Sequence, residues 1–215
     1  MKDRASTPDT PMGPTVTEPP AQVESSRWDY FLRTWQQLDV PDGWRAEIVD
    51  DNGVVLEAPP SDPHNYIAVR VNRALARAVP DDWGIYQTLG IQVPAVERLY
   101  MPDLVVMPES VVLDPSRSPC PADEAELVVE IVSKSSKDTD RKNKLWGYAH
   151  GPVPLYLLVD AWDENGPSVT LYEQPGNGRY NHATTVDFGE KITLPEPFGL
   201  DIDTSKFPGP DTWPA

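Results

Sequence analysis

The sequence predicts an α/β fold with a mixed central β-sheet flanked by helices, preceded by an N-terminal helix and a β-hairpin. Two short apolar runs, at residues 127–132 and 155–160, are typical of strands that are covered on both faces. Apolar residues at helical spacing between Pro63 and Pro80 predict an amphipathic helix. Helical and strand patterns that follow one another in this way indicate a layered α/β domain.

Length and composition divide the 215 residues into one domain between two tails. Residues 1–26 are rich in Pro, Thr, Ser and Glu, so they cannot bury enough apolar surface to offset the entropy lost on ordering. We expect a disordered tail at 1–26, a folded domain at 27–207 and a C-terminal tail at 208–215. The single cysteine, Cys120, excludes an internal disulfide, and the absence of a long apolar run or basic leader predicts a cytoplasmic protein outside membranes.

The first elements follow from periodicity and turn residues. Large apolar residues recur at helical spacing in residues 27–38, and we assign its aromatic side chains to packing rather than to base stacking. Asn52-Gly53 is a strong hairpin signal between strands expected at 44–49 and 54–57. Ser61 or Asp62 would cap the next helix, which Pro63 opens and which we expect to run to Pro80.

The later elements are predicted in the same manner from apolar runs, glycines and prolines. They are a strand at 83–93, a turn at 96–99, a strand at 104–107, an exposed loop near the site at 108–124, a strand at 127–132, a helix at 138–149 capped by Asp138, a strand at 155–160, a hairpin at 169–173 and 179–185, and a closing segment at 200–207.

Glu130 lies in the middle of the apolar run 127–132. A carboxylate buried there costs several kcal/mol unless it is paired, protonated or bound to a cation. Asp103 opens the apolar run 104–107, and if the two strands are neighbours, about 4.8 Å apart, both carboxylates could hold one ion. Oxygen ligands suit Mg²⁺ or Mn²⁺. The sequence therefore predicts a metal site formed by Asp103 and Glu130.

Several nearby residues keep two interpretations. Glu47 is either an exposed strand residue or a further acid beside the metal. His64 is more consistent with a hydrogen-bonding role than with a metal ligand, and the scattered histidines do not predict zinc. Asp140 precedes Lys144 by one helical turn, which is also the spacing of an ordinary surface ion pair.

The order of these motifs resembles the Uma-two family of restriction endonucleases, part of the PD-(D/E)xK nuclease superfamily. The resemblance covers about residues 44–207. The residues that carry it are Glu47, Ile48, Val49, Asp50, Gly53, Ser61, His64, Pro102, Asp103, Glu130, Ser133, Asp140, Lys144, Tyr148, Ala149, Val153, Pro154, Tyr156, Val159 and Asp160.

The resemblance implies a restriction-endonuclease-like fold and a metal-dependent endonuclease that hydrolyses nucleic acid, with DNA favoured. It implies Mg²⁺ (or Mn²⁺) as the cofactor, Asp103 and Glu130 as its ligands, and Glu47 and Lys144 as further catalytic residues. The superfamily's lysine two positions after the glutamate is Val132 here. The resemblance therefore places the lysine on the following helix.

Lys144 matches the family position, and Lys142 and Lys134 are the alternatives. The Pro that the family has after its Ser is Lys134 in this sequence, and its Gln after His is Asn65.

The formal charge of −16 works against nucleic-acid binding, which depends largely on neutralised phosphates. Five cationic side chains near the site partly offset it. We expect weak binding unless a partner or a second subunit helps, and therefore a homodimer. Two alternatives stay open, a catalytically inactive nuclease-fold binding or assembly module and a hydrolase of smaller phosphoesters. The cationic residues are Lys134, Lys137, Arg141, Lys142 and Lys144.

Overall fold

The computed structural model describes residues 26–213. The helices are α1 (Arg27–Gln37), α2 (Asp62–Leu75), α3 (Glu109–Val112) and α4 (Leu145–His150), and a π-helical turn, Thr139–Lys144, leads into α4. The strands are β1 (Arg45–Asp50), β2 (Gly53–Glu57), β3 (Trp83–Tyr86), β4 (Ile91–Val93), β5 (Arg98–Tyr100), β6 (Leu104–Pro108), β7 (Cys120–Pro121), β8 (Leu127–Ile131), β9 (Leu155–Asp160), β10 (Ser168–Gly176), β11 (Arg179–Asp187), β12 (Lys191–Leu194) and β13 (Leu200–Asp203).

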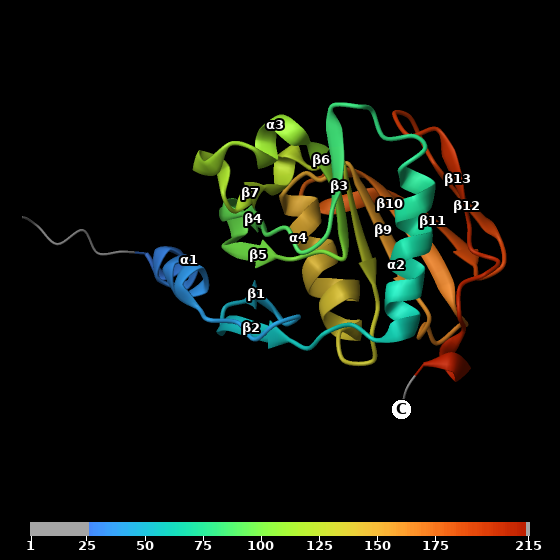
Figure 1. Ribbon diagram of the computed structural model, residues 1–215, viewed down its shortest axis with the longest axis horizontal. Coiled ribbons are helices and arrows are strands. Elements are labelled where there is room, and N and C mark those ends of the chain that lie inside the picture. The colour runs from blue at the N-terminus through green and yellow to red at the C-terminus, as the bar shows by residue number, and fades with distance from the viewer. Residues whose placement is uncertain (1–25, 214–215) are drawn as a thin grey trace, which may run out of the picture.

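The described strands form two larger sheets and a small two-stranded one (Figure 1). The six-stranded sheet has the order β11-β10-β9-β8-β6-β3, and the five-stranded sheet has the order β2-β1-β5-β4-β7. In the first sheet β8 and β9 are parallel and the other pairs are antiparallel. The predicted α/β fold with a mixed central sheet, an N-terminal helix and a hairpin is confirmed.

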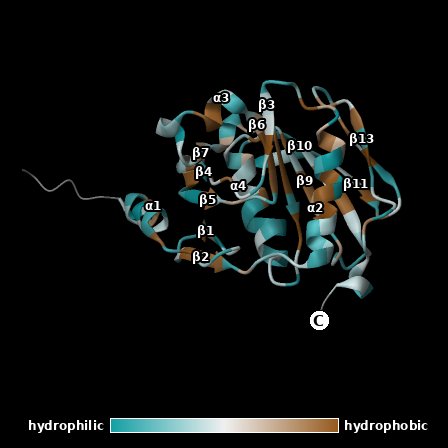
Figure 2. Ribbon diagram, viewed as in Figure 1, coloured by the Kyte–Doolittle hydropathy of each residue, from teal (hydrophilic) through white to brown (hydrophobic). Residues whose placement is uncertain are grey.

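The central strands β8 and β9 are joined by the π-helical turn and α4, the crossover that a parallel pair requires. Both strands are buried throughout, and the hydrophobic residues in Figure 2 concentrate on the central strands. Val129 packs in one cluster with α2 residues such as Val71, whereas Val128 packs in a second cluster with Tyr148 of α4. The sheet therefore lies between α2 and α4, and alternate residues of β8 face each of them.

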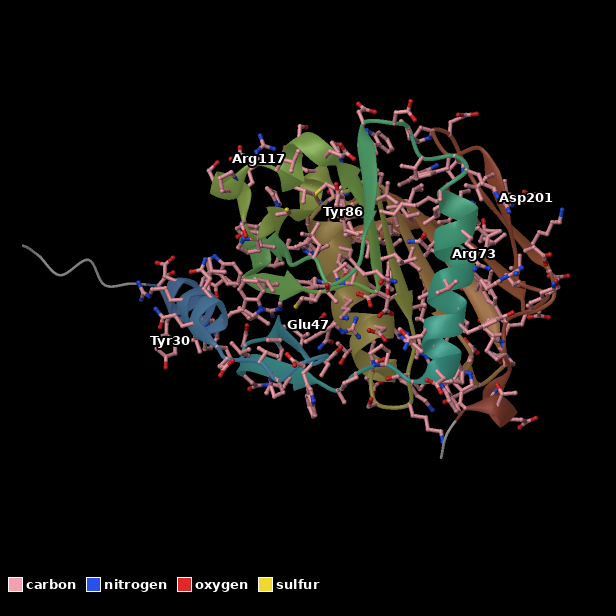
Figure 3. The ribbon with its side chains drawn as sticks, viewed as in Figure 1. Tyr30, Glu47, Arg73, Tyr86, Arg117 and Asp201 are labelled. Carbon is pink, nitrogen blue, oxygen red and sulfur yellow. The ribbon has the colours of Figure 1, made fainter. Side chains whose placement is uncertain are left out.

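The N-terminal helix α1 begins with a capping box, in which Ser26 and Asp29 bond each other's backbone amides. Trp35 donates a 2.6 Å hydrogen bond to the carbonyl of Ala46 in β1, which fixes α1 on the hairpin. Tyr30 points away from the domain and is 61% exposed (Figure 3). The predicted N-terminal helix is confirmed.

Three of the predicted elements are corrected. The strand expected at 83–93 is two strands in different sheets, because Thr88 adopts a left-handed conformation between β3 and β4. The turn expected at 96–99 includes β5, which pairs with β1 and β4. The helix expected to reach Pro80 ends at Leu75.

The segment 108–124 is not wholly an exposed loop. It contains α3 and β7, and Val111, Cys120 and Ala122 are buried in the cluster that packs against α4. Asp138 does not cap the helix that follows it with its side chain, which instead pairs with Lys142 at 2.8 Å. Strand β12, which the sequence did not indicate, pairs with β13.

The expected N-terminal tail lies outside the described residues, apart from Ser26. The expected C-terminal tail includes a 3-10 helix, Pro210–Thr212, followed by Trp213, which packs edge-on against Trp162. Within the described residues no helix has the length and apolarity that a membrane span needs.

Candidate active site

A cleft of about 590 Å³ is bordered by the β1–β2 hairpin, the start of α2, the end of β8 and the turn into α4. The carboxylates of Asp103, Glu130 and Asp140 and the ammonium of Lys144 line it. A larger hollow of about 680 Å³ beside Tyr66 has a single carboxylate in its lining. The acidic cleft is therefore the candidate active site.

Glu130 projects from β8 on the face that Val128 shares, toward α4. Tyr148 donates a 2.6 Å hydrogen bond to Glu130 Oε1, and Lys144 Nζ lies 3.1 Å from the same oxygen. Glu130 is 1% exposed. A carboxylate is tolerated in this buried strand because a hydroxyl donor and an ammonium group both satisfy it.

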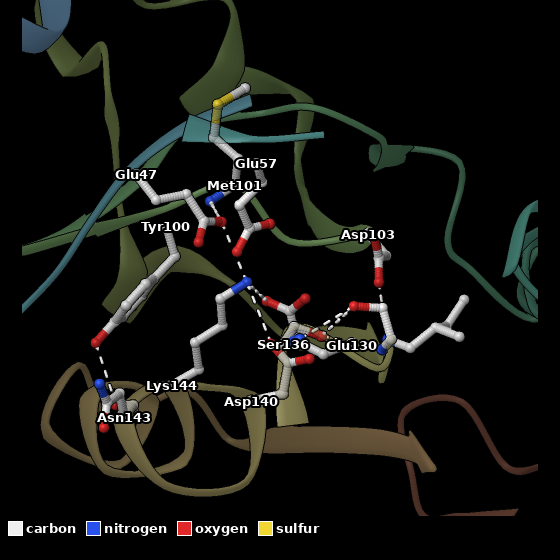
Figure 4. A network of polar contacts seen from close by, with 12 residues as sticks. Glu47, Glu57, Tyr100, Met101, Asp103, Glu130, Ser136, Asp140, Asn143 and Lys144 are labelled. Atoms are coloured by element: carbon white, nitrogen blue, oxygen red, sulfur yellow. Dashed lines mark hydrogen bonds and ion pairs between the residues drawn. The ribbon is translucent and has the colours of Figure 1, made fainter. Parts of the chain in front are cut away.

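Lys144 lies at the centre of the acidic cluster (Figure 4). Its Nζ is 3.1 Å from Glu47 Oε1 and 3.5 Å from Asp140 Oδ1, in addition to its contact with Glu130. Asp140 and Lys144 are both in the π-helical turn, a local distortion that often marks functional positions. Three carboxylates from β1, β8 and this turn therefore surround one buried ammonium.

Asp103 precedes β6 directly, and the antiparallel register of Leu104 with Val129 places it beside Glu130. Its Oδ1 accepts a 2.7 Å hydrogen bond from Arg45. Its Oδ2 accepts a 2.8 Å bond from the backbone amide of Ile131 and lies 3.0 Å from His64 Nε2. Three donors from three segments therefore fix the Asp103 carboxylate.

Glu47 lies in β1 and is fully buried. Figure 3 labels it where the hairpin meets the rest of the domain. Its Oε1 accepts a 2.6 Å hydrogen bond from the Met101 amide. Its Oε2 is buried and has no hydrogen-bond partner among the described residues. A buried carboxylate oxygen without a donor is costly, so Glu47 has an unused acceptor beside the cleft residues.

Burial dominates the electrostatics of the cluster. It raises the pKa of Glu47 to about 7 and that of Asp140 to about 6, against the opposing effect of Lys144. Burial likewise raises the pKa of Glu130 well above its usual value. Burial alone would lower the pKa of Lys144, but the surrounding carboxylates raise it well above the ordinary value.

Asp103 behaves in the opposite way. Burial alone would raise its pKa, but His64 and Arg45 stabilise the ionised form and lower it below the ordinary value. Asp103 is therefore an anion at neutral pH, whereas the carboxylates around Lys144 hold protons more strongly than usual.

The donor chemistry of the cleft fits a hard divalent cation. Its acids supply oxygen ligands only, and Glu47 Oε2 lacks any partner among the described residues. No group of three His, Cys, Asp or Glu in the described part of the chain is arranged to hold a metal ion. Mg²⁺ is commonly bound by one or two carboxylates, with waters and substrate phosphates completing its shell. Asp103 and Glu130 both line the cleft, so two carboxylates are available to a cation there.

The structure brings together Asp103, Glu130, Glu47 and Lys144, the four residues singled out in the sequence. Of the two alternative lysines, Lys142 pairs with exposed Asp138 and lies outside the cleft lining. Lys134 lines the cleft, and its Nζ lies 5.0 Å from the centre of the Trp162 ring.

Two contributors to the cluster were missed in the sequence. Arg45 opens β1 two residues before Glu47, a spacing that puts both side chains on one face of a strand. The alternation of side chains along the strand could therefore have indicated that Arg45 lies on the same face as Glu47. Tyr148 was seen as a packing residue, and nothing local indicated that its hydroxyl reaches Glu130.

A protein-family model described as "Uma2: Putative restriction endonuclease" matches residues 28–205, which is most of the chain. The chain belongs to the Uma2 family. This match confirms the Uma-two resemblance that the motifs predict, and the family description supports a nuclease-like function.

The Uma2 chain is also similar to a solved structure described as a putative nuclease belonging to DUF820 from Anabaena variabilis ATCC 29413. The TM-score is 0.62 at 14% identity, over 84% of this chain and 96% of that one. At this identity the likeness shows a shared fold. No curated protein matches the sequence.

Proposed function

We propose that this Uma2 protein is a metal-dependent endonuclease that hydrolyses phosphodiester bonds in DNA. The observation that carries the proposal is that Lys144, Glu130 and Asp103 line one cleft and that Lys144 contacts both Glu130 and the buried Glu47. Carboxylates can hold the divalent cation that activates water in phosphodiester hydrolysis, and a fixed ammonium can stabilise the charge that develops on the phosphate. The family description supports the same reaction class.

Asp103 and Glu130 are the residues that would hold Mg²⁺ or Mn²⁺. Glu47 Oε2, which has no hydrogen-bond partner among the described residues, would serve as a further ligand or as an acceptor that orients water. A bound divalent cation activates water and offsets the negative charge that builds on the phosphoryl group. Lys144 supplies a fixed positive charge that also offsets the charge on the phosphoryl group. Its ion pairs hold Glu47 and Glu130 in place. Arg45 and His64 orient Asp103.

A catalytically inactive binding or assembly module is the second candidate. The observation that favours it is that the carboxylates are already paired by the protein, since Lys144 contacts three of them and Asp103 has three donors. The net charge of −16 favours it as well, because it weakens contact with phosphates. A homodimer stays a prediction under both functions.

The test is cleavage of supercoiled plasmid and of single-stranded DNA with Mg²⁺ or Mn²⁺, compared with the same reactions in EDTA. We expect metal-dependent cleavage by the wild type and its loss in Glu130→Gln and Lys144→Ala. Calorimetric titration of the wild type with Mn²⁺ supplies a readout that does not depend on turnover.

The matched controls are Glu126→Gln, which changes an acid just before β8, and Lys142→Ala, which removes an exposed cation of the π-helical turn. Both controls should cleave at the wild-type rate. A wild type that neither binds Mn²⁺ nor cuts DNA would exclude the nuclease and leave the inactive module. Turnover of a small phosphodiester without cleavage of DNA would instead indicate the smaller-substrate hydrolase.

A further inference from the structure

Three large apolar residues in the lining of the cleft are exposed. Trp44 is 41% exposed, Val55 40% and Leu56 44%, and all three line the cleft. They belong to the β1–β2 hairpin and the residue just before it. Exposed apolar groups beside a cleft are one feature of binding surfaces.

The loop after β8 brings groups of a different kind to the same cleft. Ser133, Lys134, Ser135 and Ser136 all line it, so hydroxyl groups and an ammonium lie next to the carboxylates. Lys134 Nζ lies 5.0 Å from the centre of the Trp162 ring, and Lys137 Nζ lies 5.3 Å from it. These side chains are suited to phosphate oxygens, as donors and as cations.

The overall charge decides which nucleic acid this combination suits. A duplex binds mainly through many phosphate contacts, and a chain with a net charge of −16 supplies few cations for them. A single strand adds base stacking on aromatic side chains, which does not depend on charge. The cleft volume of about 590 Å³ is within the ordinary range for small-ligand sites, about 300–1,000 Å³, so it suits one or two unpaired nucleotides rather than a duplex.

We infer that the cleft recognises single-stranded DNA, with an unpaired base stacked on Trp44 and a phosphate beside Lys134. The inference rests on the proposed nuclease function for its choice of nucleic acid, and it adds the substrate class. Stacking on Trp44 adds affinity that does not depend on phosphate contacts, which the acidic surface makes weak. The bound backbone then passes the carboxylates at the base of the cleft.

The test measures binding separately from cleavage, by fluorescence anisotropy of a labelled oligonucleotide in EDTA. We expect a single strand to bind at least about 10-fold more tightly than the same sequence as a duplex. Trp44→Ala should weaken single-strand binding by about 10-fold, the loss typical of one stacked base, and Trp44→Phe should retain most of the affinity. Trp146→Ala is the matched control, because Trp146 is 42% exposed but lines a different hollow beside Arg98.

The phosphate contact has its own readout in the salt dependence. Lys134→Ala should reduce the slope of log Kd against log salt by about 0.7 for a single strand, and Lys142→Ala, outside the cleft, should leave it unchanged. Duplex binding as tight as single-strand binding would overturn the inference, as would equal losses in Trp44→Ala and Trp146→Ala. Tighter binding of single-stranded RNA than of DNA would overturn the choice of DNA.

Cleavage assays with Mg²⁺ separate this inference from the proposed function. Single strands that bind as expected but stay uncut contradict the nuclease and leave the binding site intact. Single-stranded DNA that is cut equally well by wild type and Trp44→Ala, and no faster than duplex DNA, contradicts the single-strand site and leaves the nuclease intact.

Discussion

Lys144 Nζ lies 3.1 Å from Glu130 Oε1, so a buried ion pair joins the turn before α4 to β8, a central strand of the six-stranded sheet. Both residues are almost fully buried, at 1% exposure each. The pKa of each residue depends on the charge of the other and on the neighbouring carboxylates. Changes to one member therefore alter stability, protonation and metal binding together.

Removing the ammonium is expected to destabilise the fold strongly. Lys144→Met would leave the carboxylates of Glu47, Glu130 and Asp140 without their shared cation, and breaking a buried pair typically costs about 3–5 kcal/mol. Urea denaturation in EDTA measures the change in unfolding free energy. Lys142→Met is the control, since its pair with Asp138 is exposed and such pairs contribute about 0–1 kcal/mol. Equal losses in the two variants would contradict the prediction.

Stability should depend on pH through the protonation of Glu47 and Asp140. Burial raises their pKa values to about 7 and about 6, above the unfolded values of about 4. At pH values between about 4.5 and 7, the folded protein binds more protons than the unfolded chain. The free energy of unfolding therefore falls as the pH rises through this range. Each proton contributes a slope of about 1.4 kcal/mol per pH unit.

Glu47→Gln should reduce this slope by up to about 1.4 kcal/mol per pH unit, the contribution of one proton. Urea denaturation at several pH values in metal-free buffer measures the change. The control is Glu126→Gln outside the acidic cluster. An unchanged slope in Glu47→Gln would contradict the assignment. Asp103 has the opposite sign, because its pKa is lowered by its partners, and its contribution is lost only as pH falls below about 4.

Metal binding should stabilise the folded protein. A ligand at 100 times its Kd adds about 2.7 kcal/mol when it binds only the folded state. We expect Mn²⁺ to raise the melting temperature of the wild type, and not that of Glu130→Gln or Asp103→Asn. Asp138→Asn, which changes an exposed carboxylate, should respond like the wild type. Thermal melts followed by circular dichroism give this result without a cleavage assay. Equal responses in all four proteins would place the ion elsewhere.

Arg45 and His64 should act on activity through Asp103, because each supplies one of its hydrogen-bond donors. Residues that orient metal ligands typically change affinity or activity by about 10- to 100-fold when removed. We expect His64→Ala to lower cleavage and Mn²⁺ affinity in that range. His64→Gln, which keeps an amide N–H donor in place of Nε2, should recover part of both. Calorimetry and cleavage rates are the measurements, and equal defects in the two variants would show that the hydrogen bond is not the cause.

The strands of the central sheet were predictable from sequence because their signals are local. The apolar run that gives β9 needs no knowledge of its neighbours, and its bounds match the prediction. Glu130 was identifiable for the same reason, since a carboxylate inside such a run needs a partner wherever the strand lies. Asp103 followed from its position just before the next apolar run.

The missed features depend on residues that are distant in sequence. Arg45 reaches Asp103 across 58 positions, and nothing near either residue indicates that contact. Strand β5 has three residues and exists because β1 and β4 pair with it. Glu47 was ambiguous for a similar reason. The face of β1 that carries Glu47 is buried by the turn before α4, and that contact cannot be inferred from the residues of the hairpin.

Tyr148→Phe isolates the hydroxyl that orients Glu130. Tyr148 donates a 2.6 Å bond to a carboxylate, whereas neighbouring Tyr156, also fully buried, donates a 3.0 Å bond to the backbone carbonyl of Asp140. Since a bond to a charged group is worth about 1.5–3 kcal/mol and a neutral one about 1, Tyr148→Phe should destabilise more than Tyr156→Phe in urea denaturation. It should also reduce metal-dependent cleavage by at least about 10-fold, while Tyr156→Phe stays within about twofold. Equal rates in both variants would mean that Lys144 alone positions Glu130.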